Sequence, residues 1–330
     1  MNTRMGLQKD QHYTTSEARE WQQLVEFEND HQNDPPTTEW IFKGLPDENY
    51  RLLTTLERDI ANVAGIDPNR DFKCLGELLK DGLQRMEGSK KDSIKDIEKG
   101  LIRKFQRQCH HYDMETPDKD DILEWLALMR HYGAPTRLLD WTYSFYVALF
   151  FAISEAKFQN GTVSAAVWAL EKKSIIEELK RREPVISVSL EGDEHVTCQT
   201  WEKVFNRRNP AAFVYPANPF RLNERLVIQQ GDFLCPGDIT KTFEDNLVAV
   251  LPNRANNKHK LVKCTIELDP PKRRKVLLRL HTMNINRATL FPGLGGFAES
   301  LKTLIVSPKN LIKSASVCKS RPWSQAKRKI

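Results

Sequence analysis

The sequence lacks the short signatures that mark the commonest nucleotide-binding and hydrolase sites. It contains no G-x-G-x-x-G fingerprint, no G-x-x-x-x-G-K-[ST] phosphate loop and no G-x-S-x-G nucleophile turn. Internal repeats and low-complexity segments are absent as well. These absences exclude the simplest assignments to the Rossmann, P-loop and α/β-hydrolase classes.

Metal-ligand spacings and membrane segments are also missing. His110 and His111 are adjacent, so on a helix they point about 100° apart, and no HxxxH spacing occurs. No apolar run has transmembrane length, and no secretory apolar region follows Met1. The six cysteines are scattered without a CxxC pair, which indicates reduced thiols. We expect a soluble, cytoplasmic protein that has no metal site and no membrane partner.

The positive charge is concentrated at the end of the chain. The net charge is +6, and residues 309–330 hold seven Lys and Arg residues and no acidic residue. The other 308 residues have 43 basic and 44 acidic side chains. One interpretation of 309–330 is a solvated, flexible tail. The alternative is a nucleic-acid-binding segment, because Trp323 lies among its lysines and arginines and can stack on a base.

Hydrophobic periodicity predicts helices first and strands later. Expected helices cover residues 14–29, 75–83, 94–105, 125–129, 145–153, 172–182, 195–206 and 271–283. This order favours an α+β fold in which a helical N-terminal half packs on a mixed, mostly antiparallel sheet. We divide the chain into an N-terminal helix and linker (1–35), one α+β domain (36–308) and the basic tail (309–330).

Short apolar or alternating runs supply the predicted strands. They are residues 40–42, 136–141, 162–170, 185–190, 211–215, 224–230, 247–251 and 261–268. In the run at 224–230, Arg225 and Gln229 share one face of the expected strand. That face either lines a cleft or is the solvated side of an edge strand.

The segment His131–Ile153, HYGAPTRLLDWTYSFYVALFFAI, sets dense polar chemistry against a buried helix. Asp140, Thr142 and Ser144 are each capable of capping the apolar helix that follows. Arg137 is costly to bury unless an anion neutralises it. That anion is either a carboxylate of the same chain, for which Asp140 is the candidate, or the phosphate of a ligand.

Four segments resemble the FRG domain family, in the same order along about residues 15–305. They are WIFKG from Trp40 with Tyr50, Leu52 and Arg58 after it, HYGAPTRLLDWT from His131, RLVIQQGDF from Arg225, and INRATLFPGLGGF from Ile285. The resemblance implies an FRG-type domain of the kind found in bacteria and their phages, and it says more about fold than about activity.

Two positions depart from the pattern of that family. The family name implies Phe-Arg-Gly, whereas this chain has Phe42-Lys43-Gly44, and lysine loses the planar fork of arginine. Gln is common before the HYG segment of the family, and this chain has Arg130 there. Any bidentate contact that the family makes through the first arginine is therefore in doubt.

The polar segments have a layout similar to that of ADP-ribosyltransferases, which bind NAD as a substrate. In this interpretation the catalytic residues are Arg137, Asp140, Gln229 and Glu224. The residues that contact NAD are Lys43, Gly44, His131, Tyr132, Thr142, Ser144 and Arg225. Arginine would neutralise the pyrophosphate, and a carboxylate would stabilise the oxocarbenium-like centre. Because a Gln cannot act as a base, the layout predicts slow or absent catalysis.

Two other functions stay open from the sequence. One is a non-catalytic module that binds a nucleotide or a carboxylate of a partner in the cleft of Arg137. The other is nucleic-acid binding through 309–330. If the chain is an ADP-ribosyltransferase, it is an enzyme or toxin that modifies a protein or nucleic acid. The sequence does not identify that target.

Overall fold

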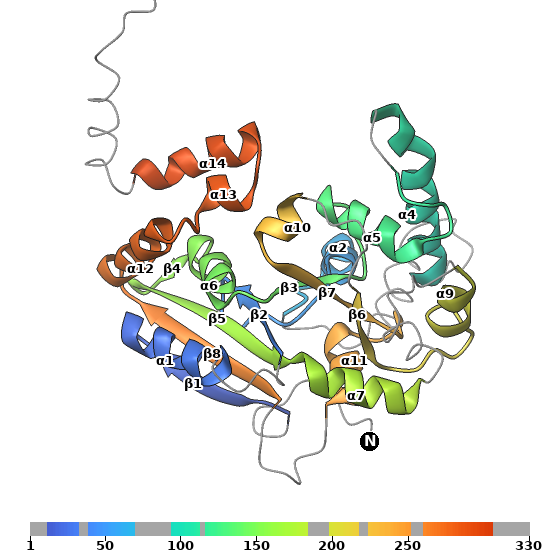
Figure 1. Cartoon of the computed structure of the whole chain (residues 1–330), viewed down its shortest axis with the longest axis horizontal. Coiled ribbons are helices and arrows are strands. Elements are labelled where there is room, and N and C mark those ends of the chain that lie inside the picture. Colours follow the sequence, from blue (N-terminus) through green and yellow to red (C-terminus); the bar gives the residue numbers. More distant parts are fainter. Residues whose placement is uncertain are drawn as a thin grey trace, which may run out of the picture.

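The computed structural model describes residues 12–32, 39–69, 94–112, 116–183, 198–217, 224–251 and 260–305. One mixed sheet runs through them in the order β1-β8-β5-β2-β3-β7-β6, and β4 pairs with β5 beside this path (Figure 1). β1 and β8 are parallel and all other neighbours are antiparallel. The strands are β1 (Thr14–Ala18), β2 (Trp40–Leu45), β3 (Leu139–Thr142), β4 (Phe158–Gln159), β5 (Thr162–Glu171), β6 (Val214–Ala217), β7 (Gly231–Pro236) and β8 (Leu261–Leu268).

Helices cover both faces of this sheet, so the predicted α+β class with a mixed, mostly antiparallel sheet is confirmed. They are α1 (Trp21–Gln32), α2 (Thr55–Val63), α4 (Ile94–Gln108) followed by the 3-10 turn η1 (Cys109–Tyr112), α5 (Ile122–His131), α6 (Phe145–Ser154), α7 (Lys172–Arg182), α9 (Cys198–Val204), α10 (Glu224–Ile228), α11 (Phe243–Val250), α12 (Pro270–Thr282), α13 (Arg287–Leu290) and α14 (Leu294–Ile305). In the described ranges, no helix combines the length and the apolar composition that crossing a membrane requires.

The two faces of the sheet bury two separate apolar clusters. Helices α1, α6 and α12 pack on the face that presents Phe42 and Val167. Helices α4, α5, α7, α9 and α11 cover the face that presents Ile41 and Trp168. Successive residues of β2 and β5 thus point to opposite clusters, as the period of two along a strand requires.

Helix α6 lies directly against β2 because Gly44 has no side chain. A Cβ at Gly44 would be 2.0 Å from the carbonyl oxygen of Ala148 and 2.7 Å from the amide nitrogen of Ala152. Ser144 begins the helix, and its Oγ accepts a hydrogen bond from the amide of Val147 at 3.3 Å. The apolar composition of α6 is thereby explained, since the helix is enclosed by the sheet and its neighbours.

Three local predictions were wrong, each for an identifiable reason. The helix expected over residues 14–29 does not begin at Thr14, because residues 14–18 are β1 and pair with β8. The run 224–230 is not a strand: its first five residues form α10, and only Leu226 is buried. The run 247–251 is not a strand either, since Thr242 begins α11 with a capping box and the helix continues to Val250.

Other predictions agree with the structure or fall outside it. The structure contains the strands predicted at 40–42, 162–170 and 261–268. It also contains the helices predicted at 145–153, 172–182 and 271–283. The sequence placed residues 1–35 outside the main domain, but β1 and α1 are part of the same sheet and its helical layer. The helix expected at 75–83, the strand expected at 185–190 and the tail at 309–330 lie outside the described residues.

Candidate functional site

A pocket of about 680 Å³ opens over the strands β2 and β3. Its walls come from α2, α5, α6, α10 and α13 and from the loop after β2, elements that can be found around β2 and β3 in Figure 1. Segments from residue 42 to residue 291 therefore meet at one place. The lining is rich in basic side chains, with six Lys and Arg residues against two carboxylates among the described residues.

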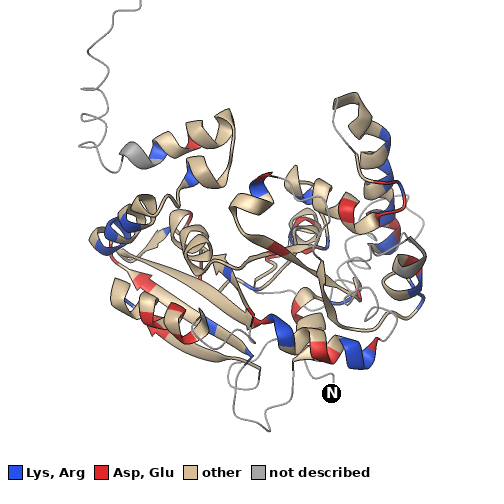
Figure 2. Ribbon diagram, viewed as in Figure 1, with Lys and Arg blue, Asp and Glu red and all other residues tan. Residues whose placement is uncertain are grey.

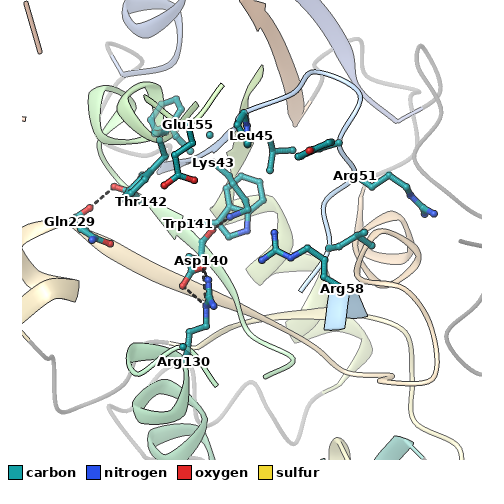
Figure 3. A pocket seen from close by; sticks show the side chains of 18 of the residues that line it. Lys43, Leu45, Arg51, Arg58, Arg130, Asp140, Trp141, Thr142, Glu155 and Gln229 are labelled. Atoms are coloured by element: carbon teal, nitrogen blue, oxygen red, sulfur yellow. Dashed lines mark hydrogen bonds and ion pairs between the residues drawn. The ribbon is translucent and has the colours of Figure 1, made fainter. Parts of the chain in front are cut away.

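Three of the six basic side chains are matched by carboxylates. The pairs are Arg51 with Glu244 at 2.7 Å, Arg130 with Asp140 at 3.0 Å, and Arg287 with Glu155 at 3.1 Å. Arg51 turns away from the centre of the pocket, whereas Arg58 turns toward it (Figure 3). The other three basic side chains of the pocket have no carboxylate within ion-pair distance among the described residues.

Those three are Lys43, Arg58 and Arg225, which we call the cation triad. Lys43 Nζ donates a hydrogen bond to the backbone oxygen of Asp140 at 2.9 Å. The guanidinium of Arg225 lies 4.4 Å from the ring centre of Phe291. Within the described part of the chain, no carboxylate lies within ion-pair distance of any triad member.

The environment disfavours the charged form of each triad member. Burial lowers the pKa of Lys43 to about 8; Asp140 opposes this shift, and the nearby charges of Arg58 and Arg130 add to it. Burial also lowers the pKa of Arg58 and of Arg225. An anion in this pocket would relieve that penalty.

Asp140 is an ionised carboxylate at neutral pH. Burial opposes its ionisation, but the guanidinium of Arg130 and the charge of Lys43 hold the pKa of Asp140 at about 2. Arg130 binds it through Nε, which is 3.0 Å from both carboxylate oxygens. Both departures from the family pattern, Lys43 and Arg130, therefore meet at this one residue.

Six of the predicted site residues lie together in the pocket. They are Lys43, Gly44, Asp140, Thr142, Arg225 and Gln229. The predicted cleft between the β2 end, the β3 segment and the residues near 225–229 thus exists, although the last segment is a short helix. Gly44 contributes a close contact between β2 and α6, because its missing Cβ admits that helix.

Gln229 holds the walls together. Thr142 Oγ1 donates to the backbone oxygen of Gln229 at 2.6 Å, as Figure 3 shows. Gln229 Nε2 donates to the backbone oxygen of Leu290 at 2.8 Å. The side-chain amide of Gln229 therefore joins α10 to α13, and its role in this structure is to position the pocket wall.

Arg137 does not lie in the pocket, and the prediction that it meets an external anion was wrong. Its side chain is 1% exposed and forms a bidentate ion pair with Glu98 of α4, with Nε 2.7 Å from Oε1. Nη1 donates to the backbone oxygen of Pro236, and the guanidinium lies 4.8 Å from the ring centre of Trp201. The anion that neutralises Arg137 is thus a carboxylate of the same chain.

Four further predicted residues do not line the pocket. Glu224 is exposed at the first position of α10, so it cannot supply the carboxylate assigned to it. Ser144 caps α6. His131 and Tyr132 lie at the end of α5 with their rings 4.7 Å apart, and Tyr132 is 61% exposed. None of the four is placed where a ligand in the pocket would touch it.

The sequence analysis did not include Arg58, Arg130, Arg287 or Glu155 in the site. Arg58 and Arg287 lie in segments that resemble the family, and Arg130 is a position where the chain departs from the family pattern. These features of the sequence could have identified them. Glu155 follows the buried helix α6 and gave no signal. Among the described residues, no three His, Cys, Asp or Glu side chains are grouped as a metal site would require.

Comparison with known proteins agrees with the motifs. A family model described as the FRG domain matches residues 38–161, which include β2, α2, α5, β3 and α6. Neither the curated proteins nor the solved structures include a match to the chain. The matched range supplies the floor of the pocket and two members of the cation triad, Lys43 and Arg58. The chain therefore carries an FRG domain.

Proposed function

We propose that the pocket binds a phosphate-bearing nucleotide. The observation that carries this proposal is the cation triad of Lys43, Arg58 and Arg225, which lines the pocket with no carboxylate partner among the described residues. The pocket holds more positive than negative charge, and the charge of Arg58 repels that of Lys43 there. A ligand that brings two or more negative charges would remove that repulsion.

Phosphate suits these side chains better than a single carboxylate does. A guanidinium binds two phosphate oxygens at once through parallel N–H donors. The attraction between unit charges 4 Å apart near a protein surface is worth about 4 kcal/mol. Arg58 belongs to α2 and Arg225 to α10, so a diphosphate that contacts both would bridge two parts of the pocket wall.

The remaining lining suits the rings of a nucleotide. The cavity of about 680 Å³ falls in the range of about 300–1,000 Å³ typical of small-molecule sites. Its walls include the aromatic side chains of Phe151, Phe291 and Tyr50, against which a planar base can pack. NAD has two phosphates and two such rings, and it remains the first ligand to test.

Binding of NAD would permit a second function, ADP-ribosyl transfer. This requires a carboxylate near the ribose, and the pocket offers Asp140 and Glu155. Asp140 is ionised, which favours it as the charge that stabilises an oxocarbenium-like centre. Its pairing with Arg130 offsets part of that charge. The arrangement therefore supports nucleotide binding more strongly than turnover.

Isothermal titration calorimetry with NAD, ADP-ribose and inorganic pyrophosphate tests the binding proposal. We expect the double substitution Arg58→Met and Arg225→Met to weaken pyrophosphate binding at least tenfold. Lys302→Met is the matched control, since Lys302 is exposed and lies on α14 outside the pocket. Equal affinities in the wild type and the double variant would reject the pocket as the anion site.

A turnover assay separates the transferase from a non-catalytic module. The protein is incubated with NAD labelled in the nicotinamide ring, and released nicotinamide is measured with the wild type and with Asp140→Asn. Release that depends on Asp140 supports the transferase. Binding of NAD without release of nicotinamide supports the non-catalytic module.

Nucleic-acid binding through 309–330 stays a prediction, and deletion of those residues should abolish any salt-dependent binding of DNA or RNA.

A further inference from the structure

We infer that the ε-amine of Lys43 forms a reversible imine with the carbonyl group of a phosphorylated aldehyde or ketone whose phosphate is held by Arg58 and Arg225. This inference rests on the proposed phosphate site and names a class of compound that the site would take. It assigns to Lys43 a covalent role that an arginine at the same position would not perform.

The fold holds Lys43 firmly at the floor of the pocket. It lies in β2, opposite Trp168 of β5, in the middle of a six-residue register. The next residue, Gly44, lies against the backbone of α6, so β2 cannot shift there without a clash. A nucleophile on such a strand has a defined direction of approach, which a reaction with a bound carbonyl requires.

The contacts of Lys43 leave its nitrogen able to react. Its hydrogen bond goes to a backbone oxygen, that of Asp140, and a neutral amine can make the same bond while keeping its lone pair. The buried lysine of α7 offers the contrast. Lys172 Nζ lies 2.7 Å from Asp232 Oδ2, and this ion pair with a buried carboxylate holds Lys172 in its charged form.

The surrounding charges raise the fraction of neutral amine. Burial is the main reason that the pKa of Lys43 is lowered to about 8; the charge of Asp140 opposes this shift, and the guanidiniums of Arg58 and Arg130 contribute to it. Roughly one tenth of the amine is then neutral at pH 7, compared with less than about one in a thousand for an ordinary lysine. A lysine placed among other cations in a desolvated pocket is a known way to obtain an amine nucleophile.

The reaction balances without an oxidant or reductant. The nitrogen lone pair attacks the carbonyl carbon, and the electrons of the C=O π bond move to oxygen. A proton passes from nitrogen to that oxygen and gives a carbinolamine. Departure of the hydroxyl group, with a proton, as water leaves the C=N bond of the imine, and addition of water reverses the sequence.

Pyridoxal 5′-phosphate is a suitable probe, because it carries an aldehyde and a phosphate on one ring. The full chain is incubated with it at low concentration, the imine is reduced with borohydride, and the labelled lysines are located by peptide mass spectrometry. We expect Lys43 to be labelled at least tenfold faster than exposed Lys302, with a rate that rises toward pH 8. Lys172 should remain unlabelled.

Two comparisons separate covalent chemistry from phosphate binding. Lys43→Arg should abolish labelling of the β2 peptide while pyrophosphate still binds. Arg58→Met with Arg225→Met should slow labelling of Lys43 at least tenfold, and pyridoxal without its phosphate should label Lys43 at a similarly reduced rate.

Labelling of Lys43 no faster than Lys302 would overturn the imine, whatever the affinity for pyrophosphate. Equal labelling by pyridoxal and its phosphate would also overturn it, because the phosphate would then have no part in placing the aldehyde. Loss of pyrophosphate binding itself would instead count against the proposed function. The comparison of Lys43 with Lys302 uses the wild-type chain, so it holds even if Lys43→Arg fails to fold.

Discussion

Two sets of basic side chains differ in how the cost of burying their charge is met. Arg137 is enclosed in the core and paired with Glu98 of the same chain. Lys43, Arg58 and Arg225 surround a pocket and have no carboxylate partner among the described residues. A buried cation with an internal partner is neutralised within the fold, whereas partly buried cations without one indicate a site for an external anion.

The largest effect is expected from breaking the core pair. Glu98→Gln removes the negative charge and leaves the guanidinium of Arg137 buried without a counter-ion. We expect the free energy of unfolding to fall by about 3–5 kcal/mol. Urea denaturation followed by circular dichroism measures this loss. Glu299→Gln is the control, because its pair with Lys302 is exposed and should contribute little to stability.

The same comparison can be sharpened by removing both charges of the core pair. Glu98→Leu combined with Arg137→Met should recover most of the stability lost in Glu98→Gln, since apolar side chains of similar size often replace a buried ion pair without loss. A loss below about 1 kcal/mol in Glu98→Gln would mean that water or another group already neutralises Arg137, and the contrast with the pocket would disappear.

The error over Arg137 shows what the sequence could not reveal. The segment HYGAPTRLLDWT was expected to place polar side chains beside a buried helix, and Asp140 and Thr142 from it lie in the pocket. Its polar density did not show which side chains point inward. Glu98 lies 39 residues earlier on α4, and no local pattern connects it to Arg137.

Two long patterns predicted their elements correctly, and one short run did not. The strand at 261–268 and the buried helix after Ser144 both follow from runs of eight or more residues. The segment 224–228 is too short for its period to be read, and its apolar residues Val227 and Ile228 are exposed. Arg58 of α2 and Arg225 of α10 both line the pocket although they lie far apart in the sequence, and sequence order does not display this.

The second prediction concerns pH, because Lys43 has a lowered pKa and Arg137 does not. The pKa of Lys43 is about 8 in the folded chain and about 10.5 in the unfolded chain. Between these values the unfolded chain binds more protons, so Lys43 makes stability rise with pH across that window. Below pH 8 its charge costs up to about 3 kcal/mol.

Lys43→Met removes this contribution, so the variant should be more stable than the wild type below pH 8 and should lose that advantage toward pH 10.5. Urea denaturation of both proteins at pH 7 and pH 10 measures the difference, and subtraction cancels the titration of the other lysines and tyrosines. If the difference in the free energy of unfolding between Lys43→Met and the wild type is the same at both pH values, the pKa of Lys43 is not lowered by folding.

The third prediction is that removing a cation of the pocket, unlike breaking the core pair, affects ligand binding more than stability. Arg58→Met should leave the free energy of unfolding within about 1 kcal/mol of the wild type or raise it, because it removes repulsion with Arg130 and breaks no ion pair in the described residues. Its affinity for pyrophosphate should fall by about tenfold, which corresponds to about 1.4 kcal/mol. A destabilisation as large as that of Glu98→Gln would mean that Arg58 is a structural cation like Arg137.

The smallest effect is expected at the rim, where Arg287 is paired with the exposed carboxylate of Glu155. Glu155→Gln should change the free energy of unfolding by less than about 1 kcal/mol, because an exposed pair contributes little. It also removes a negative charge from the pocket wall, so Arg287 joins the cations available to a ligand. We therefore expect pyrophosphate to bind a few-fold more tightly at low ionic strength, with the gain lost as salt screens the rim. Titration calorimetry at two salt concentrations measures this, and weaker binding by Glu155→Gln would indicate that Glu155 positions Arg287 for the anion instead of competing with it.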